Sequence, residues 1–196
     1  LKRRKNMART TERAIIDCTI KLAEKKSLKK ITVKNIADNC GITRNTFYYY
    51  FHDIYDVMEA FVDEKMDELN EANKDDPYKT VFGLIEFSVS HRKVFINLYR
   101  SLEHDQMSNF IIKRLRRILV RAINEASGDY ALPKQDFDII LAFYEEALSG
   151  IMIRWIKDEK SIITPERIRQ NVYRQQVLFT NQVNTCIENS KNNPLN

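Results

Sequence analysis

The side chains best suited to chemistry gather in one short stretch, GITRNTFYYYFHDIYD, residues 41–56. It carries hydroxyl, guanidinium, amide and imidazole groups, and six aromatic rings besides His52. Polar groups of these kinds donate and accept hydrogen bonds at the base edges and phosphates of nucleic acid. The rings have three conceivable uses: packing in a core, stacking on bases, or holding hydroxyl groups in fixed positions.

No catalytic constellation accompanies these groups. The sequence contains no nucleophile-elbow, zinc-protease or P-loop pattern, and its three His residues are isolated. Glu145 and Glu146 are adjacent on a predicted helix and therefore diverge. Cys18, Cys40 and Cys186 are scattered without a CxxC pair, which is typical of reduced thiols in a cytoplasmic protein. We therefore expect neither an enzyme nor a cofactor or metal centre.

The charge is unevenly distributed along the chain. Residues 1–50 hold 13 Lys and Arg against 4 Asp and Glu, a balance of +9, whereas residues 51–196 hold 19 against 23, a balance of −4. A basic head on a mildly acidic body is typical of a nucleic-acid-binding module joined to another domain. A lysine-rich solvated surface would give the same balance.

The composition indicates a globular, helical protein without a membrane segment. An apolar content of 43% argues against disorder, and four Gly and four Pro favour long helices over a turn-rich β architecture. No apolar run reaches the roughly 18–20 residues that a membrane helix needs. The start, LKRRKNMARTTERA, lacks the apolar segment of a secretory signal, so we expect a cytoplasmic protein.

Three predicted helices position the polar stretch. Apolar residues at every third or fourth position predict a helix over residues 11–26. Thr32 can cap a short second helix, and Gly41 can take positive φ in the turn that follows. Thr43 can cap a third helix that continues to Tyr50. Two short helices joined in this way form a helix-turn-helix, whose second helix enters the major groove of DNA.

Beyond Asp53 the pattern stays helical almost to the end. A long helix is predicted to about residue 73, and Pro77 is placed for the first turn of the next one. Further helices are predicted over residues 78–90, 93–102, 106–126, 135–158 and 165–189. The predicted fold class is therefore all-α, with about nine helices: a three-helix head, residues 1–55, and a larger helical body, residues 56–196.

One segment resembles a known family. Residues 31–57, ITVKNIADNCGITRNTFYYYFHDIYDV, resemble the DNA-binding head of the TetR/AcrR-type transcriptional regulators. The residues that match are Thr32, Ile36, Ala37, Gly41, Thr43, Thr46, Tyr48, Tyr49 and Phe51. A weaker similarity covers residues 145–166 of the body. The family implies a homodimer with two heads on a palindromic operator, and a ligand-binding and dimerisation body whose inducer releases the DNA.

Two residues depart from the family pattern. Ile54 stands where members usually have Lys, so one phosphate contact is either missing or supplied by His52. Asn45 stands where members often have Gly, and its side chain can reach a base edge or a phosphate.

Sequence readout is expected from the start of the third helix, from Thr43, Arg44, Asn45 and Thr46. Arg44 can form a bidentate contact with guanine, and Asn45 can pair with adenine, each worth about 1–3 kcal/mol of discrimination. The alternative for Arg44 is a phosphate contact alone.

Phosphate contacts are expected from a second group of residues. Thr32 and Lys34 lie at the positive end of the second helix's dipole. On a helical wheel Tyr48 faces the groove, where its hydroxyl can donate to a phosphate, and the resemblance gives both Tyr48 and Tyr50 this role. The basic arm, with Lys2, Arg3, Arg4, Lys5 and Arg9, either reaches the minor groove or adjacent phosphates, or is a tail without defined contacts.

The remaining rings of the stretch are expected to pack. Phe47 and Phe51 are spaced i, i+4 and would face the core, and Tyr49 would lie half-buried against the first helix. Base stacking is not expected, because it requires splayed single strands.

The resemblance implies a ligand cavity in the body, and large apolar side chains there suit an apolar or planar ligand. The candidate lining residues are Phe61, Met66, Phe87, Tyr99, Met107, Phe110, Phe143 and Trp155. The alternative is that these residues only fill the core. His91 and His104 are expected on a helix joint and a loop surface.

The last two predicted helices are candidates for the dimer interface, as a four-helix bundle about a two-fold axis. The seam would comprise Ile140, Phe143, Tyr144, Ala147, Ile151, Arg154 and Trp155 with Ile168, Val172, Gln175, Phe179, Val183 and Ile187. The alternative is that these helices close the core of one chain. The basic run KRLRR, residues 113–117, is expected on a solvated face.

The leading interpretation is a ligand-responsive repressor. Its expected partners are an operator in double-stranded DNA, a second copy of the chain and an unidentified small-molecule inducer. One alternative is a regulator or coactivator whose body docks another protein, which an exposed apolar surface without a closed cavity would favour. A second is a helical scaffold whose head no longer binds DNA, an idea that only Ile54 supports.

Overall fold

The computed structural model describes residues 2–158 and 164–192, and for residues 2–9, 165, 172 and 173 it describes the backbone alone. The described part contains nine α-helices, one short 3-10 helix and no strand, so the all-α prediction is confirmed. The helices are α1 Lys2–Ala23, η1 Leu28–Lys30, α2 Val33–Cys40, α3 Arg44–Tyr50, α4 Ile54–Ala72, α5 Pro77–Ser90, α6 Arg92–Tyr99, α7 His104–Ser127, α8 Lys134–Lys157 and α9 Pro165–Asn192.

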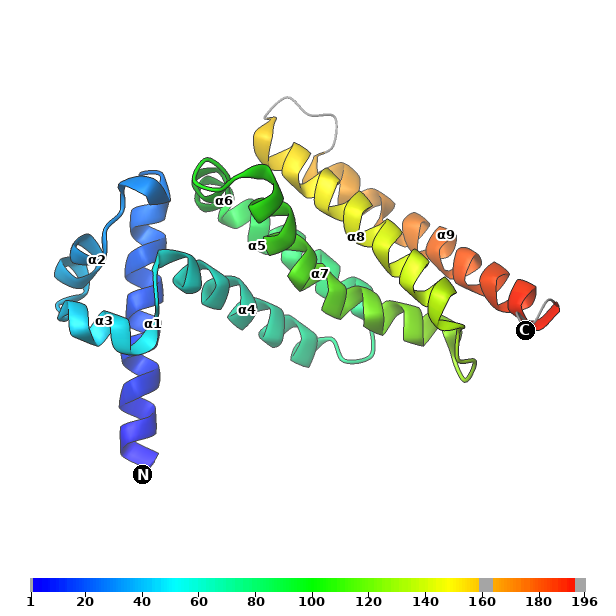
Figure 1. Ribbon diagram of the computed structural model, residues 1–196, viewed down its shortest axis with the longest axis horizontal. Helices are drawn as coiled ribbons and strands as arrows, with labels where there is room; N and C mark the ends of the chain where they lie inside the picture. Colours follow the sequence, from blue (N-terminus) through cyan, green and yellow to red (C-terminus); the bar gives the residue numbers. More distant parts are fainter. Residues whose placement is uncertain (1, 159–163, 193–196) are drawn as a thin grey trace.

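The helices divide into a head and a body (Figure 1). α1, α2 and α3 form the head at one end of the molecule, α4 leads from the head to the body, and α5–α9 make up the rest. α1 begins nine residues before the predicted start at residue 11. The reason is that residues 2–9 are mostly Lys, Arg, Met and Ala, good helix formers without an apolar pattern that would reveal the helix.

Carboxylate caps fix where α4 and α5 begin. The Asp53 side chain accepts hydrogen bonds from the backbone N–H groups of Tyr55 and Asp56, at 2.7 and 3.0 Å. Asp76 caps α5 in the same way, and Pro77 occupies its first turn, as predicted. Only residues 51–53 separate the end of α3 from the start of α4.

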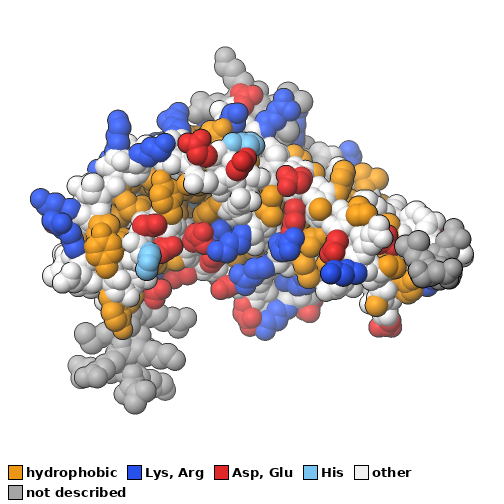
Figure 2. Space-filling view, viewed as in Figure 1, with side chains coloured by type: hydrophobic (Ala, Val, Ile, Leu, Met, Phe, Trp, Pro, Cys, Tyr) orange, Lys and Arg blue, Asp and Glu red, His pale blue; other side chains and the backbone are white. Residues whose placement is uncertain are grey.

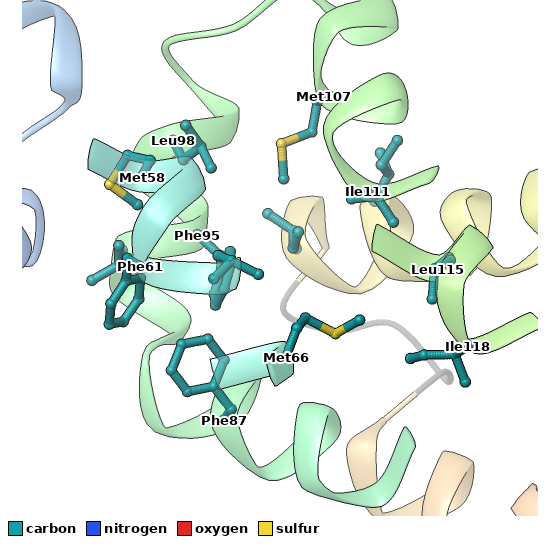
Figure 3. Packing of buried hydrophobic residues seen from close by; sticks show 14 of the residues in the cluster. Met58, Phe61, Met66, Phe87, Phe95, Leu98, Met107, Ile111, Leu115 and Ile118 are labelled. Carbon is teal, nitrogen blue, oxygen red and sulfur yellow. The ribbon is translucent and has the colours of Figure 1, made fainter. Parts of the chain in front are cut away.

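One continuous hydrophobic core runs from the head into the body. Phe47 and Phe51 are buried in it, which confirms their predicted packing. Met58 and Met66 carry the core along α4, and Figure 3 shows them among side chains from neighbouring helices. The burial of the Phe47 side chain alone stabilises the fold by about 2–3 kcal/mol.

The predicted dimer seam is partly an intramolecular core. Ile140 of α8 and Phe179, Val183 and Ile187 of α9 are buried within the chain. They therefore follow the alternative, in which the last two helices close the core of one protomer. The side chain of Val172 lies outside the described residues.

The basic run of α7 is not simply solvated, so that prediction is wrong for part of it. Arg114 is buried, and its Nη2 lies 3.1 Å from Asp63 Oδ2 and 3.3 Å from Glu59 Oε2 on α4. Lys113 pairs with Glu59, and Arg117 pairs with Asp67, each with 2.6 Å between the nitrogen and the carboxylate oxygen. Figure 2 shows acidic and basic side chains alternating across the middle of the face, where Figure 1 places α4 and α7.

Candidate nucleic-acid interface and body cavity

The turn between α2 and α3 is held by local hydrogen bonds at both helix starts. Thr32 and Asn35 form a reciprocal capping box, in which each side chain accepts a 3.1 Å bond from the other's backbone N–H. Gly41 ends α2 with φ 67° and ψ 33°, a left-handed conformation that favours glycine. The Thr43 side chain then accepts from the N–H of Thr46 at 3.1 Å and opens α3. These predicted caps are confirmed, and they fix the angle between the two helices.

α3 presents an exposed polar face. Arg44 and Asn45 are exposed, and so are Tyr48 and Tyr49, by 57% and 80%. Arg44 and Tyr48 are spaced i, i+4, and so are Asn45 and Tyr49, which places the four side chains in two neighbouring columns. Within the described residues none of the four side chains forms a hydrogen bond or an ion pair, so their polar groups are available to a ligand.

The structure reverses the expected packing of two tyrosines. Tyr49 is not half-buried but is the most exposed large ring on α3, so that expectation is wrong. Tyr50 instead packs partly against the hydrophobic core, and its ring meets that of Tyr49 edge-on, with 5.0 Å between centroids. Tyr49 is therefore a candidate contact residue that the sequence interpretation missed. Its position four residues after Asn45, and therefore on the same face of the helix, could have predicted this.

The two threonines at the start of α3, the N-cap Thr43 and Thr46, are already engaged. The hydroxyl oxygens of Thr43 and Thr46 lie 2.9 Å apart, and Thr43 also caps the helix. Both residues therefore hold α3 in shape, and at most one of the two hydroxyl protons is left for a base or phosphate.

The residues expected to contact phosphates outside α3 differ in how free their side chains are. Lys34 is exposed and makes no hydrogen bond or ion pair within the described residues, while the exposed Thr32 is occupied in the capping box. The backbone of the arm residues continues α1, but the side chains of Lys2, Arg3, Arg4, Lys5 and Arg9 lie outside the described residues.

The start of α4 is a poor anion site. Asp53 occupies the N–H groups of Tyr55 and Asp56, and the Asp56 side chain accepts from the backbone N–H of His52 at 2.9 Å. Two carboxylates therefore stand where a phosphate would otherwise bind the helix dipole. Ile54 packs against the core, and the imidazole of His52 at this position is exposed.

Two thiols hold α2 against α1. Cys40 donates a long hydrogen bond to the backbone oxygen of Ala14, with 3.6 Å between Sγ and O. Burial and the neighbouring Cys18 thiol raise the pKa of Cys40 to about 12. The group is therefore a neutral packing element near pH 7 and not a reactive thiolate.

The body contains an apolar cavity of about 130 Å³. Five of the eight predicted lining residues border it: Met66, Phe87, Met107, Phe110 and Trp155. Figure 3 shows Met66 of α4, Phe95 of α6 and Met107 of α7 converging from three helices. The lining also includes Ser88 and Arg114, which are its polar residues.

Three predicted lining residues lie elsewhere. Phe61 stands behind the cavity wall, with its ring centroid 4.9 Å from that of Phe87. Tyr99 lies under the ammonium group of Lys157, 5.9 Å from its ring centroid. Phe143 is 60% exposed on α8 and cannot contact a buried ligand. His91 lies at the α5–α6 joint, and His104 is exposed at the start of α7.

An exposed apolar surface covers part of α8 and α9. We call it the α8/α9 face, and it comprises Ile139, Phe143, Val177 and Leu178, each 58–60% exposed. A hydrogen bond of 2.9 Å from Tyr144 Oη to Gln182 Oε1 ties the two helices together beside it. Figure 2 shows hydrophobic side chains over the part of the surface that α8 forms. Ile139 was missed because α8 is apolar on more than one side, and Val177 and Leu178 of α9 were also absent from the predicted seam.

Two other kinds of site are absent from the described residues. No helix there is long and apolar enough to span a bilayer. No group of three or more His, Cys, Asp or Glu residues there is arranged to hold a metal ion.

The chain is similar to two known protein families and to a solved structure. Residues 15–61 match the family described as "Bacterial regulatory proteins, tetR family", and residues 75–175 match the family described as "Transcriptional regulator C-terminal region". Among solved structures, the "Dihydroxyacetone kinase operon activator DhaS" superposes with a TM-score of 0.58 and 19% identity, over 92% of this chain and 96% of that one. At this identity the likeness shows the fold alone. No curated protein sequence matches the chain.

The two matches cover the head and most of the body, and the second alone spans more than half of the 196 residues. The capped helix-turn-helix with a free polar face agrees with the first match, and the all-helical body agrees with the second. The chain belongs to the TetR family of DNA-binding transcriptional regulators.

Proposed function

We propose that this regulator is a homodimeric, cytoplasmic repressor that binds a palindromic operator and is released by a small molecule in the body cavity. The observation that carries the proposal is the exposed polar face of α3, whose four free side chains stand on a helix fixed by caps. A rigid helix end with unengaged donors is what direct readout in a major groove requires.

In this proposal the residues divide into readers and positioners. Arg44 and Asn45 contact base edges, where their fork and amide geometries match guanine and adenine. Tyr48 and Tyr49 contact the backbone through their hydroxyls, and Lys34 adds a charged phosphate contact. The roles of Thr32, Thr43, Thr46, Tyr50 and His52 are secondary, because the first three are caps or cap partners, Tyr50 is partly buried, and His52 lies beside two carboxylates.

The α8/α9 face supports the homodimer. Four large apolar side chains exposed by more than half would be unfavourable on an isolated surface, and a two-fold axis can bury each against its counterpart. Gly150 leaves open space on α8, since a Cβ there would meet nothing within 4 Å, so a partner helix can approach closely. Two heads on one dimer then match the two half-sites of a palindrome.

The cavity supports release by a small molecule rather than regulation by a docked protein. It is lined by α4, and α4 begins directly after the DNA-reading helix. A ligand that binds one position of α4 better than another shifts the spacing of the two heads. The similar structure of DhaS is that of an operon activator, so a reporter experiment has to read both signs of regulation.

The experiment is a salt titration of binding to DNA upstream of the protein's own gene, with random DNA as competitor. We expect nanomolar affinity that falls steeply with salt, because phosphate contacts release counterions. Arg44→Ala should lose about 1–3 kcal/mol of preference for the operator over random DNA. Tyr48→Phe should lower the affinity for operator DNA and for random DNA by a similar factor, since phosphate contacts carry no sequence information.

A matched control removes one positive charge far from the head. Lys74 is exposed just beyond the end of α4, so Lys74→Ala should leave both affinities unchanged. Equal and weak binding of the wild-type protein to both DNAs would contradict the proposed operator at this position. Loss of preference in Lys74→Ala would show that net charge, not readout by Arg44, sets the affinity.

A further inference from the structure

The size of the body cavity limits what it can hold. Its volume of about 130 Å³ is close to that of an engineered apolar cavity, roughly 150 Å³, which takes up benzene. Three methionines, Met66, Met107 and Met152, belong to the lining. Their unbranched side chains can shift to follow the shape of a guest. A guest of about one six-membered ring therefore fits without opening the fold.

Arg114 is the charged residue of this lining, and its three nitrogen atoms differ in whether they have hydrogen-bond partners. Its side chain is only 6% exposed, and its guanidinium carbon lies 4.0 Å from the ring centroid of Phe110. Nη1 donates to the backbone oxygen of Phe110 at 2.9 Å, and Nη2 pairs with Asp63 and Glu59. The Nε atom is buried and has no hydrogen-bond partner in the part of the chain that the structure describes. A buried donor without an acceptor is unfavourable, so an acceptor brought in by a guest is stabilised there.

The charge on Arg114 is already balanced. Glu59 and Asp63 both lie within ion-pair distance of it, and burial, which alone would raise the pKa of Glu59, is outweighed by Lys113 and Arg114, which lower it. Glu59 is therefore charged near pH 7, and Asp63 is a second acidic partner of the same guanidinium. An anionic guest beside Arg114 would add a third acidic group to a site whose described lining holds no further cation. A neutral guest avoids this repulsion.

We propose that the cavity takes a neutral, compact apolar molecule of about one ring, with a single hydrogen-bond acceptor that receives the Nε–H of Arg114. The inference rests on the proposed function, because it names the class of inducer for the cavity described there. Arg114 is then the specificity residue of the site. It also links the guest to α4, since its Nη2 pairs with Glu59 and Asp63 of that helix.

The test uses the full-length protein and three small probes. Cyclohexanone supplies a neutral acceptor, methylenecyclohexane is its isostere without an acceptor, and benzoate is an anion of similar size. Trp155, the single tryptophan of the chain, lines the cavity, so its fluorescence reports occupancy. We expect cyclohexanone to bind about tenfold more tightly than methylenecyclohexane, and benzoate to bind least.

Three variants assign the preference to the Nε–H. Arg114→Lys keeps the charge but lacks Nε, and Arg114→Met removes both; each should bind cyclohexanone and methylenecyclohexane equally. Arg117→Met removes the neighbouring exposed arginine, whose partner is Asp67, and should keep the tenfold preference. If an Arg114 variant fails to fold, the comparison of the three probes on the wild-type protein still decides the ligand class.

The outcomes separate this inference from the proposed function. Equal binding of both neutral probes to the wild type, or tighter binding of benzoate, overturns the role of Arg114 while the cavity remains a ligand site. Absence of any Trp155 response overturns the inference and the inducer part of the proposed function together. The operator titration is independent of all three probes, so a failure to bind DNA counts against the proposed function alone.

Discussion

Asn97 of α6 donates a hydrogen bond of 2.8 Å from Nδ2 to the backbone oxygen of Ala23, the last residue of α1. Around it, Ser101 Oγ lies 2.7 Å from Ser27 Oγ, and Tyr55 Oη donates to the backbone oxygen of Ser101 at 3.1 Å. These three contacts join the end of α1, the start of α4 and the end of α6. The head is therefore attached to the body by directed polar bonds as well as by the shared core.

The first prediction concerns this junction. Ala23 is fully buried, and carbonyls in the last turn of a helix have no partner within the helix. Asn97→Ala leaves the Ala23 oxygen unsatisfied, which should lower the free energy of unfolding by about 1–3 kcal/mol. Urea denaturation followed by circular dichroism measures the change. Asn109→Ala, at an exposed position of α7, is the control and should cost under about 0.5 kcal/mol; equal losses in the two variants would contradict the role of the bond.

The second prediction concerns the α8/α9 face. Phe143→Glu places a charge at the centre of a surface that we propose is buried in the dimer, where an unpaired charge is strongly unfavourable. We expect a monomer by light scattering, and operator affinity that falls at least tenfold because the two heads no longer bind together. Val89→Glu makes the same chemical change at an exposed apolar residue of α5 and should stay dimeric. A Phe143→Glu protein that remains a dimer would place the interface elsewhere.

The head could be predicted from sequence because its signals are local. The caps Thr32 and Thr43 and the left-handed Gly41 each act within four residues of their own position. The spacing of Phe47 and Phe51 was enough to assign them to the core. The spacing also predicts which of Tyr49 and Tyr50 is exposed and which faces the core. At about 100° per residue, Tyr50 lies some 60° from Phe47 and Tyr49 lies nearly opposite to it.

The body was harder because its decisive contacts are distant in sequence. The partners of Arg114 lie 51 and 55 residues away along the chain, so a basic run on α7 could not be told from a solvated face. α8 is apolar on several sides, and its pattern does not say whether Ile139 or Ile140 faces the chain's own core. The cavity is equally hard to predict, because which large side chains leave a space depends on how the six helices α4–α9 meet.

The third prediction compares two acids one turn apart on α4. Asp63 pairs with the buried Arg114, and Asp67 pairs with Arg117, which is 52% exposed. Asp63→Asn should cost about 1–2 kcal/mol, less than the roughly 3–5 kcal/mol of fully buried pairs, because Glu59 remains as a partner and Asp63 is partly solvated. Asp67→Asn should cost under about 1 kcal/mol. Urea denaturation of both variants is the measurement, and equal costs would show that burial of Arg114 does not strengthen its pairs.

The fourth prediction concerns stability at alkaline pH. Burial between α5 and α9 raises the pKa of Tyr78 to about 12, although a hydrogen bond with Thr180 acts in the opposite direction. An unfolded tyrosine titrates near pH 10. Because the folded pKa is the higher one, the contribution of Tyr78 to stability is fully present below about pH 10 and is lost as the pH rises towards 12.

Tyr78→Phe should therefore change the shape of the pH–stability curve as well as its height. The variant loses the hydrogen bond to Thr180 at every pH, but its free energy of unfolding should fall less between pH 10 and pH 12 than that of the wild type. Tyr49→Phe removes a hydroxyl that is already exposed, and its curve should run parallel to the wild-type curve. Chemical denaturation at intervals across this range gives both slopes. Parallel curves for Tyr78→Phe and the wild type would contradict the prediction, because they would mean that the hydroxyl of Tyr78 reaches solvent in the folded protein.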